Sequence, residues 1–396
     1  MTILLVCDSY ERFKLFERFE SKYLNVHLLT NMPLVYLLAR FKKLNCTLVK
    51  TNLTGVDYTN HYKDCLEYSG GKISYKNSRD IFSRYCNFLT VFFKKNKFES
   101  IIMWNGEHLI NKAVKEVGSS LSIDTLYLEL SNLPNKIFID SDGVNARSRF
   151  YKDFDKIVKE KVDIKLHSDW LKGYMLYKNK PLPQSIVTYK QIFFRFISKV
   201  FFIFQSKLIL FSYFKSSLKP MPKPFNKNKY LFDEIDIDEV NYVFCPLQVS
   251  SDTQLTMNSD FTNIDIINNA KSLIREGQHL VVKLHPAETD ESQIDKIFDM
   301  KRFFDFHIVN YSTIDLIENC ELICVNNSTV GLEGMLYSKD VISYGRAIYN
   351  GFDQGYLLDY IHNILHEGVD YFGNQSISLD GILEHYKYLE SRYDYK

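Results

Sequence analysis

Short apolar runs alternate with longer amphipathic stretches along the first half of the chain. The runs have the length of buried strands, and the stretches between them repeat apolar residues at helical spacing. This alternation predicts an α/β unit with a mostly parallel sheet. We expect strands at residues 3–7, 26–29, 47–50, 101–104, 125–130 and 136–139, and helices at 32–43, 79–95 and 109–117.

The second half repeats the same alternation. With 396 residues, the chain fits two domains. We assign residues 1–185 to an N-terminal α/β domain, 186–230 to an interdomain segment, and 231–396 to a C-terminal α/β domain closed by its last helix. In the C-terminal domain we expect strands at 242–246, 279–284, 307–309, 322–325 and 341–344, and helices near 260–276, 314–318, 332–337 and 379–392.

The interdomain segment is basic and aromatic. Residues 191–230 carry eight Lys or Arg residues and no Asp or Glu, interleaved with many Phe and Tyr residues. One interpretation is an interdomain helix whose aromatic side chains pack on both domains. The other is a surface that binds an anionic membrane, because cations attract anionic lipids and aromatic rings insert at the interface. The charges within it argue against a membrane-spanning helix.

Charge and cysteine usage limit the class of protein. The net charge of +1 carries no nucleic-acid signature. Seven cysteines form no Cys-x-x-Cys pair, which favours a reducing compartment without a disulfide framework or a zinc site. The N-terminus is apolar, with neither a charged leader nor a cleavage site, so it is typical of a first strand rather than a signal peptide. We therefore expect a cytoplasmic protein.

The apolar run 322–325 is followed by a small polar loop and a helix-compatible segment. A buried strand that enters a helix through Ser, Thr and Gly leaves backbone N–H groups at the helix start, where phosphate binds. This pattern predicts a nucleotide-phosphate site formed by Asn327, Ser328, Thr329 and Gly331. Glu333 is expected in the first helical turn, either for ribose hydroxyls or as a capping-box acid, and Ser328 or Thr329 serves equally as an ordinary N-cap.

Other strand ends of the second half carry further candidates. In open α/β sheets, ligands bind beyond the carboxyl ends of the strands. Lys283 and His285 follow one strand and suit a donor phosphate or carboxylate, although His285 is equally a strand-end residue bonded to backbone. Gln248 and Asp252 follow another strand and suit a base or sugar hydroxyls. Arg346 is a weaker candidate, because a lone Arg in a loop is usually solvated.

Acidic residues dominate the strand ends of the first half. They are Asp8, Glu107, Glu129 and the stretch 140–145, Asp-Ser-Asp-Gly-Val-Asn. Glu129 and Asp140 are the candidate catalytic carboxylates, since a carboxylate can act as a nucleophile or as a base. The alternatives are that Glu129 caps a helix or pairs with Arg147, and that Asp140 is a turn residue. Two such sheets facing across a cleft define a GT-B-like fold.

Residues 128–134 and 139–145 resemble the "E-x-G-x-L-P … D-x-x-G-V-N" signature of bacterial capsular polysaccharide synthesis proteins, the β-Kdo glycosyltransferases that use CMP-Kdo. Pro246-Leu-Gln with Asp252 and Gln254, Lys-Leu-His-Pro at 283–286, and the block 327–349 resemble further motifs of this family, in the same order. Ser131 stands where the family usually has Gly, which puts the local turn in doubt but not the carboxylate.

The resemblance implies a two-domain GT-B-like enzyme that transfers Kdo from CMP-Kdo with retention. It implies Asp140 as nucleophile and Glu129 as acid/base, with the roles exchangeable, an N-terminal acceptor domain, and a donor site at His285, Lys283, Gln248, Asp252, Asn327, Ser328, Thr329, Gly331 and Glu333. We expect no cofactor and no metal, although Asp140-Ser-Asp142 leaves a metal-dependent transferase open.

Expected partners are a lipid-linked or oligosaccharide acceptor, an anionic membrane surface on the inner face of the cytoplasmic membrane, and other capsule synthesis proteins, but not nucleic acid. Two rival functions stay open. One is a transferase of the same fold that uses another nonulosonate or nucleotide sugar. The other is a non-catalytic capsule assembly subunit.

Overall fold

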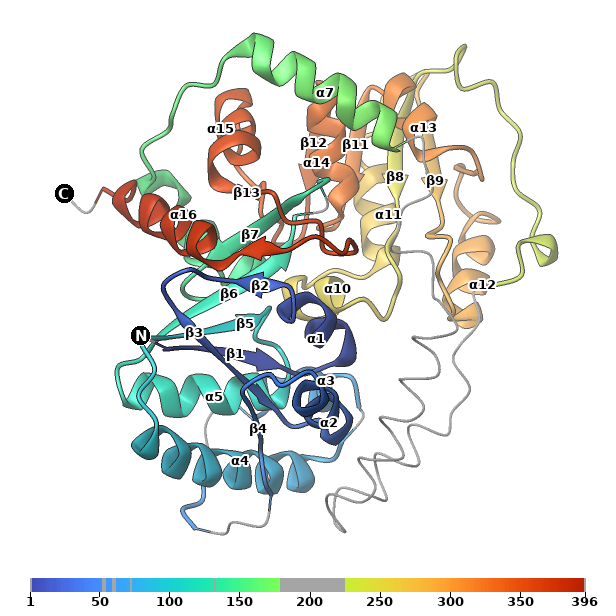
Figure 1. The fold of residues 1–396 in the computed structure, drawn as a ribbon. Helices are drawn as coiled ribbons and strands as arrows, with labels where there is room; N and C mark the ends of the chain where they lie inside the picture. Colours follow the sequence, from blue (N-terminus) through green and yellow to red (C-terminus); the bar gives the residue numbers. More distant parts are fainter. Residues whose placement is uncertain are drawn as a thin grey trace. The chain divides into compact units, whose positions relative to one another are not determined.

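The computed structural model describes residues 2–51, 55–58, 62–71, 73–131, 133–178 and 225–394 (Figure 1). The chain forms two compact units, one made of Met1–Pro220 with Asp359–Lys396 and the other of Met221–Leu358. Most of the basic aromatic segment lies outside the described residues, so both interpretations of it stay open. Among the described residues, no helix is both long and apolar enough to cross a bilayer.

The first unit is built on a seven-stranded sheet in the order β13-β7-β6-β5-β1-β3-β4. The five strands from β6 to β4 are parallel and wind as in a Rossmann fold, so β1 and β5 flank the topological switch point. At one edge β7 and β13 run antiparallel to their neighbours. The strands are β1 (Thr2–Cys7), β3 (Asn25–Thr30), β4 (Cys46–Leu48), β5 (Ser100–Trp104), β6 (Asp124–Leu130), β7 (Lys136–Asp140) and β13 (His366–Glu367).

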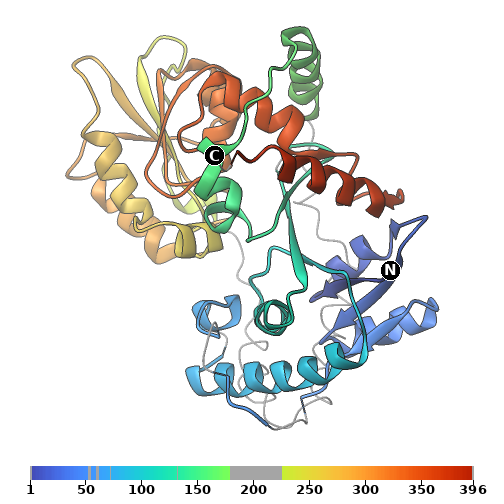
Figure 2. The ribbon, with the colours of Figure 1, turned by 90° about the vertical axis from the view of Figure 1, so that its left-hand side faces the viewer.

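Amphipathic helices cover this sheet. Ser9 and Ser74 cap α1 and α4 by accepting a backbone N–H at each helix start. Figures 1 and 2 show α4 beside α5, and the Phe92 ring of α4 also contacts His27 of β3, with ring centroids 5.6 Å apart. The helices before the gap are α1 (Tyr10–Phe16), α2 (Pro33–Phe41), α3 (Leu66–Ser69), α4 (Tyr75–Lys95), α5 (Leu109–Ser120), α6 (Arg149–Asp153) and α7 (Ile164–Lys178).

The second unit holds a five-stranded, fully parallel sheet in the order β10-β9-β8-β11-β12. The winding is again that of a Rossmann fold, with the switch point between β8 and β11, and apolar clusters fill both faces. The strands are β8 (Tyr242–Pro246), β9 (His279–Lys283), β10 (His307–Ile308), β11 (Leu322–Val325) and β12 (Asp340–Ser343). The helices are α10 (Thr253–Asn258), α11 (Asn263–Lys271), α12 (Glu291–Met300), α13 (Thr313–Asn319), α14 (Thr329–Leu336) and α15 (Gln354–Asp359).

The C-terminal residues return to the first unit, which differs from the predicted assignment of 231–396 to one domain. Strand β13 pairs with β7, and β14 (Ile377–Ser378) pairs with β2 (Phe19–Glu20). Helix α16 (Leu379–Ser391) buries Leu379 and Ile382 in the core of the first unit. An apolar helix face in the sequence indicates burial but not which sheet it covers, so the return could not be read from the pattern.

Candidate functional site

The switch point of the second unit is organised by a pair of buried amides. The Gln248 side chain donates to Asn327 Oδ1 (3.0 Å) and accepts from the Asn327 backbone N–H (3.2 Å). Asn327 Nδ2 in turn donates to the carbonyls of Gln254 (2.8 Å) and Asn258 (3.1 Å). Both side chains are at most 8% exposed. The structure thus brings these two predicted residues together, and their polar groups bind each other and the loop.

Helix α14 begins immediately after Asn327 and its loop. Ser328 is the N-cap, and its side chain accepts the Val330 N–H (3.2 Å), while its carbonyl accepts from Gly331 N–H (3.0 Å) and from the Tyr349 hydroxyl. A Cβ at Gly331 would overlap the buried Tyr349 ring, so this glycine allows the ring to approach the helix start. The N-cap alternative therefore holds for Ser328, and two N–H groups of the helix start are already engaged.

Glu333 does not lie in the helical turn that the sequence predicts. Since α14 begins at Thr329, Glu333 lies in the second turn rather than the first, which excludes the capping-box alternative. The side chain is buried, with 8% of the residue exposed. Its proposed contact with ribose hydroxyls stays a prediction.

The strand end of β9 presents a lysine and a histidine. Lys283 Nζ donates to the Tyr311 carbonyl (2.6 Å) and to Thr313 Oγ1 (2.7 Å), and burial together with the nearby Lys227 lowers its pKa to about 8. His285 is exposed, and its Nδ1 accepts from the Ala287 N–H (3.1 Å). Desolvation lowers the pKa of His285 although two carboxylates oppose it, so the ring is neutral with its proton on Nε2. Of the two, His285 is the freer to meet a ligand.

A residue that the sequence analysis missed ties two of these loops together. Glu288 is 4% exposed and accepts four hydrogen bonds, from the Ser250 N–H (2.7 Å) and hydroxyl (2.6 Å) and from the N–H groups of Thr289 (2.7 Å) and Asp290 (2.9 Å). Burial opposes ionisation, but these bonds prevail and lower the pKa of Glu288. The sequence pointed to Glu288 only through its position, two residues after Pro286, just beyond the end of β9.

Two further candidates have surface partners of their own. Asp252 is the N-cap of α10 and accepts the Gln254 N–H (2.9 Å). Arg346 forms an exposed ion pair with Asp260 (2.7 Å), in keeping with the solvated alternative. Neither observation tests contact with a nucleotide sugar.

In the first unit, Glu129 lies at the carboxyl end of β6 beside Arg12. The Glu129 carboxylate accepts the Leu130 N–H (2.9 Å). Desolvation raises the pKa of Glu129, while Arg12, Leu130, Asn105 and Trp104 act in the opposite direction. The Arg12 guanidinium stacks on the Trp104 ring, 4.4 Å from its centroid, and its position is therefore fixed. A carboxyl group with a raised pKa next to a fixed cation suits acid/base chemistry.

Asp140 is held differently. Its Oδ1 accepts the N–H groups of Asp142 (2.8 Å), Gly143 (3.2 Å) and Arg149 (2.9 Å), and its Oδ2 accepts that of Phe150 (2.9 Å). Burial raises the pKa of Asp140, and these four bonds act against it. This is the geometry of a turn residue, the alternative that the sequence left open. In register, Asp140 pairs with Tyr127 of β6, two residues before Glu129.

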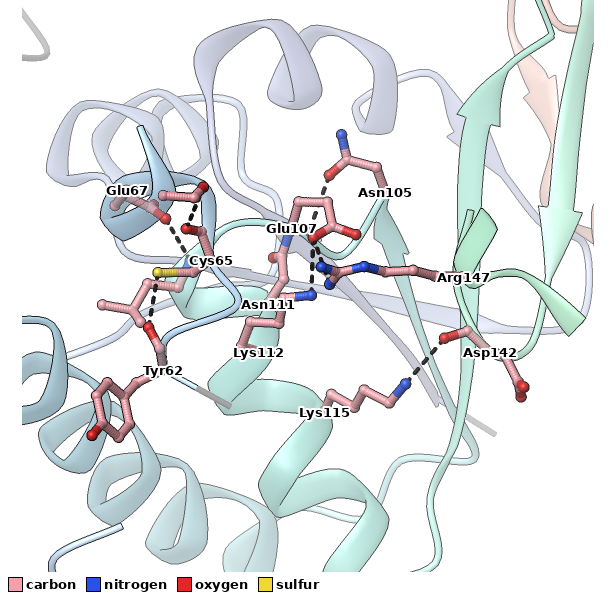
Figure 3. Close-up of polar contacts among 12 residues, drawn as sticks. Tyr62, Cys65, Glu67, Asn105, Glu107, Asn111, Lys112, Lys115, Asp142 and Arg147 are labelled. Atoms are coloured by element: carbon pink, nitrogen blue, oxygen red, sulfur yellow. Dashed lines mark hydrogen bonds and ion pairs between the residues drawn. The ribbon is translucent and has the colours of Figure 1, made fainter. Parts of the chain in front are cut away.

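A charged cluster that the sequence analysis did not assemble lies at the same edge of the sheet (Figure 3). Glu107 is 8% exposed, and its Oε2 accepts from both Lys112 and Arg147, each at 3.0 Å. Burial lowers the pKa of Lys112 although Glu107 opposes it. Arg147 therefore pairs with Glu107, and not with Glu129 as the sequence allowed. Asn105, at φ 38°, is left-handed and accepts the Glu107 N–H (3.1 Å), which fixes this loop.

Within the part of the chain that the structure describes, no three His, Cys, Asp or Glu side chains gather as a metal-ligand set. Asp142, the second acid of the Asp-x-Asp pattern, forms an exposed ion pair with Lys152 (3.1 Å). All seven cysteines are buried and free.

Two Rossmann-type units with polar side chains gathered beyond their strand ends confirm the GT-B-like α/β class predicted from the sequence. Residues 228–358 match the family model described as capsule polysaccharide biosynthesis protein. This match supports, for that segment, the resemblance to capsular polysaccharide synthesis proteins seen in the sequence. The match coincides with the second unit, Met221–Leu358.

Curated and solved relatives are more distant. Protein FixF of Sinorhizobium fredii (strain NBRC 101917 / NGR234) is 35% identical over 130 residues, which cover 31% of this chain and 31% of FixF. The beta Kdo 2,7 transferase of Thermosulfurimonas dismutans KpsC has a TM-score of 0.48 at 14% identity, over 98% of this chain and 100% of that one. UDP-GlcNAc 2-epimerase from Neisseria meningitidis has a TM-score of 0.28 at 11% identity, over 100% and 95%.

Proposed function

We propose that the protein is a glycosyltransferase that moves Kdo from CMP-Kdo to a capsule glycolipid or to its growing Kdo linker, with retention. The observation that carries the proposal is the capsule family match over 228–358, on the unit whose strand ends hold Gln248, His285 and Ser328. The signature-like acids Glu129 and Asp140 of the first unit support the Kdo assignment, since they stand in the family's order.

In this proposal the second unit binds the donor. Gln248 and Asn327 hold the loop after β11 in place, and α14 directs its positive end toward the phosphate of the cytidylate. His285 donates from Nε2 to the same phosphate or to the Kdo carboxylate. Lys283 adds positive potential at that strand end, while its hydrogen bonds fix it to the backbone.

The first unit supplies the acid chemistry. Glu129, with its raised pKa, exchanges a proton with the acceptor hydroxyl, and the Arg12 charge stabilises its ionised form. Asp140 is the nucleophile favoured by the family resemblance. Its Oδ1 accepts three backbone hydrogen bonds and its Oδ2 only one, so Oδ2 is the oxygen with a lone pair left for attack on the anomeric carbon. A role for Asp140 in shaping the turn competes with this role in the reaction.

Donor binding gives a first test. We expect CMP to raise the melting temperature of the protein, and UDP at equal concentration to leave it unchanged, because ligand binding to the folded state stabilises it. The same measurement on His285→Gln should show a smaller shift with CMP. Stabilisation by UDP alone would indicate a transferase with another nucleotide sugar, and no shift with either nucleotide would support the non-catalytic subunit.

Membrane association is a separate proposal. It depends on the basic aromatic segment 191–230 and predicts flotation of the protein with anionic liposomes at low salt and not with neutral ones. Absence of binding to anionic liposomes at low salt would remove the peripheral membrane location without touching the chemistry.

A further inference from the structure

His108 and Glu67 form an ion pair at the switch point of the first unit. His108 is the residue that precedes α5, directly after the β5 loop, and its Nδ1 lies 3.1 Å from Glu67 Oε1. The other oxygen of Glu67 accepts the Leu109 N–H (2.9 Å). One carboxylate therefore caps the helix and orients the imidazole ring.

The side chains of Glu67 and His108 differ in solvent exposure. Glu67 is buried, with 8% of the residue exposed, whereas 33% of the His108 side chain is exposed. Glu67 comes from the short helix α3, which is anchored to the same loop by the hydrogen bond from Leu66 N–H to the Glu107 carbonyl (2.9 Å). A helix cap needs only the carboxylate, so the partly exposed, oriented imidazole remains available to bind a ligand.

Charges on the neighbouring elements keep this ring protonated. Desolvation disfavours the imidazolium, and Arg12 of α1 repels it, but Asp8 after β1 and Glu67 of α3 outweigh both and raise the pKa of His108 to about 9. Asp8 is itself fixed by the side chain of Asn111 (2.8 Å). At neutral pH, His108 therefore offers a positively charged N–H donor at the edge where ligands of open α/β sheets bind.

We propose that His108, held in place by Glu67, binds an anionic group of the acceptor, either the carboxylate of a sugar acid or a phosphate. The proposal rests on the function above, in which the first unit receives the acceptor, and it adds a substrate-binding residue and its positioning residue. A Kdo-terminated linker carries the carboxylate, and a phosphorylated capsule glycolipid carries the phosphate, and the two sources are separated by the choice of probe.

The first experiment combines a change in the enzyme with a change in the acceptor. Transfer from CMP-Kdo is measured with a Kdo-terminated glycoside and its methyl ester, and with a phosphorylated glycolipid and its dephosphorylated form. For the source that binds His108, removal of the anion should lower kcat/KM about 10-fold in the wild type and hardly at all in His108→Gln. Gln retains a donor to Glu67, so the cap persists. Equal discrimination by wild type and variant would overturn the proposal.

The second experiment separates positioning from structure. With the anionic acceptor, kcat/KM should fall as pH rises through about 9, because His108 loses its charge. In Glu67→Gln this fall should move toward the ordinary histidine value near 6.5, and it should be absent with the neutral acceptor. Glu11→Gln, which removes a charge elsewhere on the first unit, is the matched control and should leave the fall in place. A fall unmoved in Glu67→Gln would contradict the positioning role.

A third measurement remains informative without turnover. Histidine-selective NMR of the full chain, with the His108 signal assigned from His108→Gln, follows that ring during titration with inorganic phosphate and with free Kdo. We expect a pKa near 9 and a shift of this signal on adding one of the two anions. If the His108 signal responds to an anion but the protein transfers no Kdo, only the proposed function is refuted. An unresponsive His108 would refute the inference alone.

Discussion

The amide pair Gln248–Asn327 is predicted to hold the donor loop, and replacing Gln248 by Met tests this directly. Met matches Gln in volume and removes both hydrogen bonds, leaving Asn327 Oδ1 and the Asn327 N–H without these partners in a buried site. At about 1–3 kcal/mol for each of the two unsatisfied groups, the second unit should lose about 2–6 kcal/mol of stability.

A double-mutant cycle isolates the pair. Asn327→Leu should destabilise to a similar degree, and the double variant should lose about 1–2 kcal/mol less than the sum of the two, because neither amide is then left unpaired. Asn268→Leu on the exposed side of α11 is the matched control and should change stability by less than about 0.5 kcal/mol.

The assay can separate the two units. Both tryptophans, Trp104 and Trp170, lie in the first unit, so their emission during urea unfolding should stay close to wild type, while far-UV circular dichroism reports an earlier transition. CMP affinity should fall together with this stability. Strictly additive costs, or weaker CMP binding by Gln248→Met with unchanged stability, would refute the positioning role and favour direct nucleotide contact.

Three further predictions concern the first unit and the start of α14. Glu129→Gln should lower the rate of Kdo transfer about 100- to 10,000-fold, measured as kcat, without changing CMP-induced stabilisation, because a proton-exchanging group is lost. Asp359→Asn should destabilise the first unit by about 3–5 kcal/mol in urea unfolding, because the buried Arg392 loses its buried counterion at 2.6 Å and keeps only the more exposed Glu160 at 3.6 Å. Gly331→Ala should lower stability by about 1–3 kcal/mol in thermal unfolding, since its Cβ meets Tyr349.

The controls for these variants come from the same chain. Asp260→Asn breaks the exposed pair with Arg346 and should cost less than about 1 kcal/mol. Gly173→Ala in α7 meets no atom within 4 Å and should be neutral or stabilising. Wild-type turnover by Glu129→Gln would contradict its role in proton exchange. A loss of stability in Asp359→Asn no larger than in Asp260→Asn would contradict the importance of the buried ion pair. Equal effects of Gly331→Ala and Gly173→Ala would contradict the steric argument for Gly331.

The strands were predictable because buried parallel strands are nearly continuous apolar runs, and β1, β5, β8 and β11 lie where those runs lie. Helices such as α7 and α12 were missed, since the burial of their apolar residues depends on neighbours distant in sequence. The return of α16 to the first unit was missed for the same reason.

The candidate site was predictable in position but only partly in detail. Strand ends located Gln248 and Asn327, but not that two amides 79 residues apart would bind each other. The pairing of Glu67 with His108 joins residues 41 apart in the sequence. Glu67 lies in a helix too short to show a hydrophobic periodicity. For Asp140 the sequence did indicate the alternative, because Asp-x-Asp-Gly is typical of a turn. The structure places four backbone N–H donors around that carboxylate.

The most direct test of the central claim is a mass-spectrometric product assay with purified full-length protein, CMP-Kdo and a set of synthetic capsule glycolipid acceptors. We expect a product heavier by one Kdo residue, joined through a β linkage, with release of CMP. Absence of any Kdo-bearing product across the acceptors, from protein that is folded and binds CMP, would contradict it.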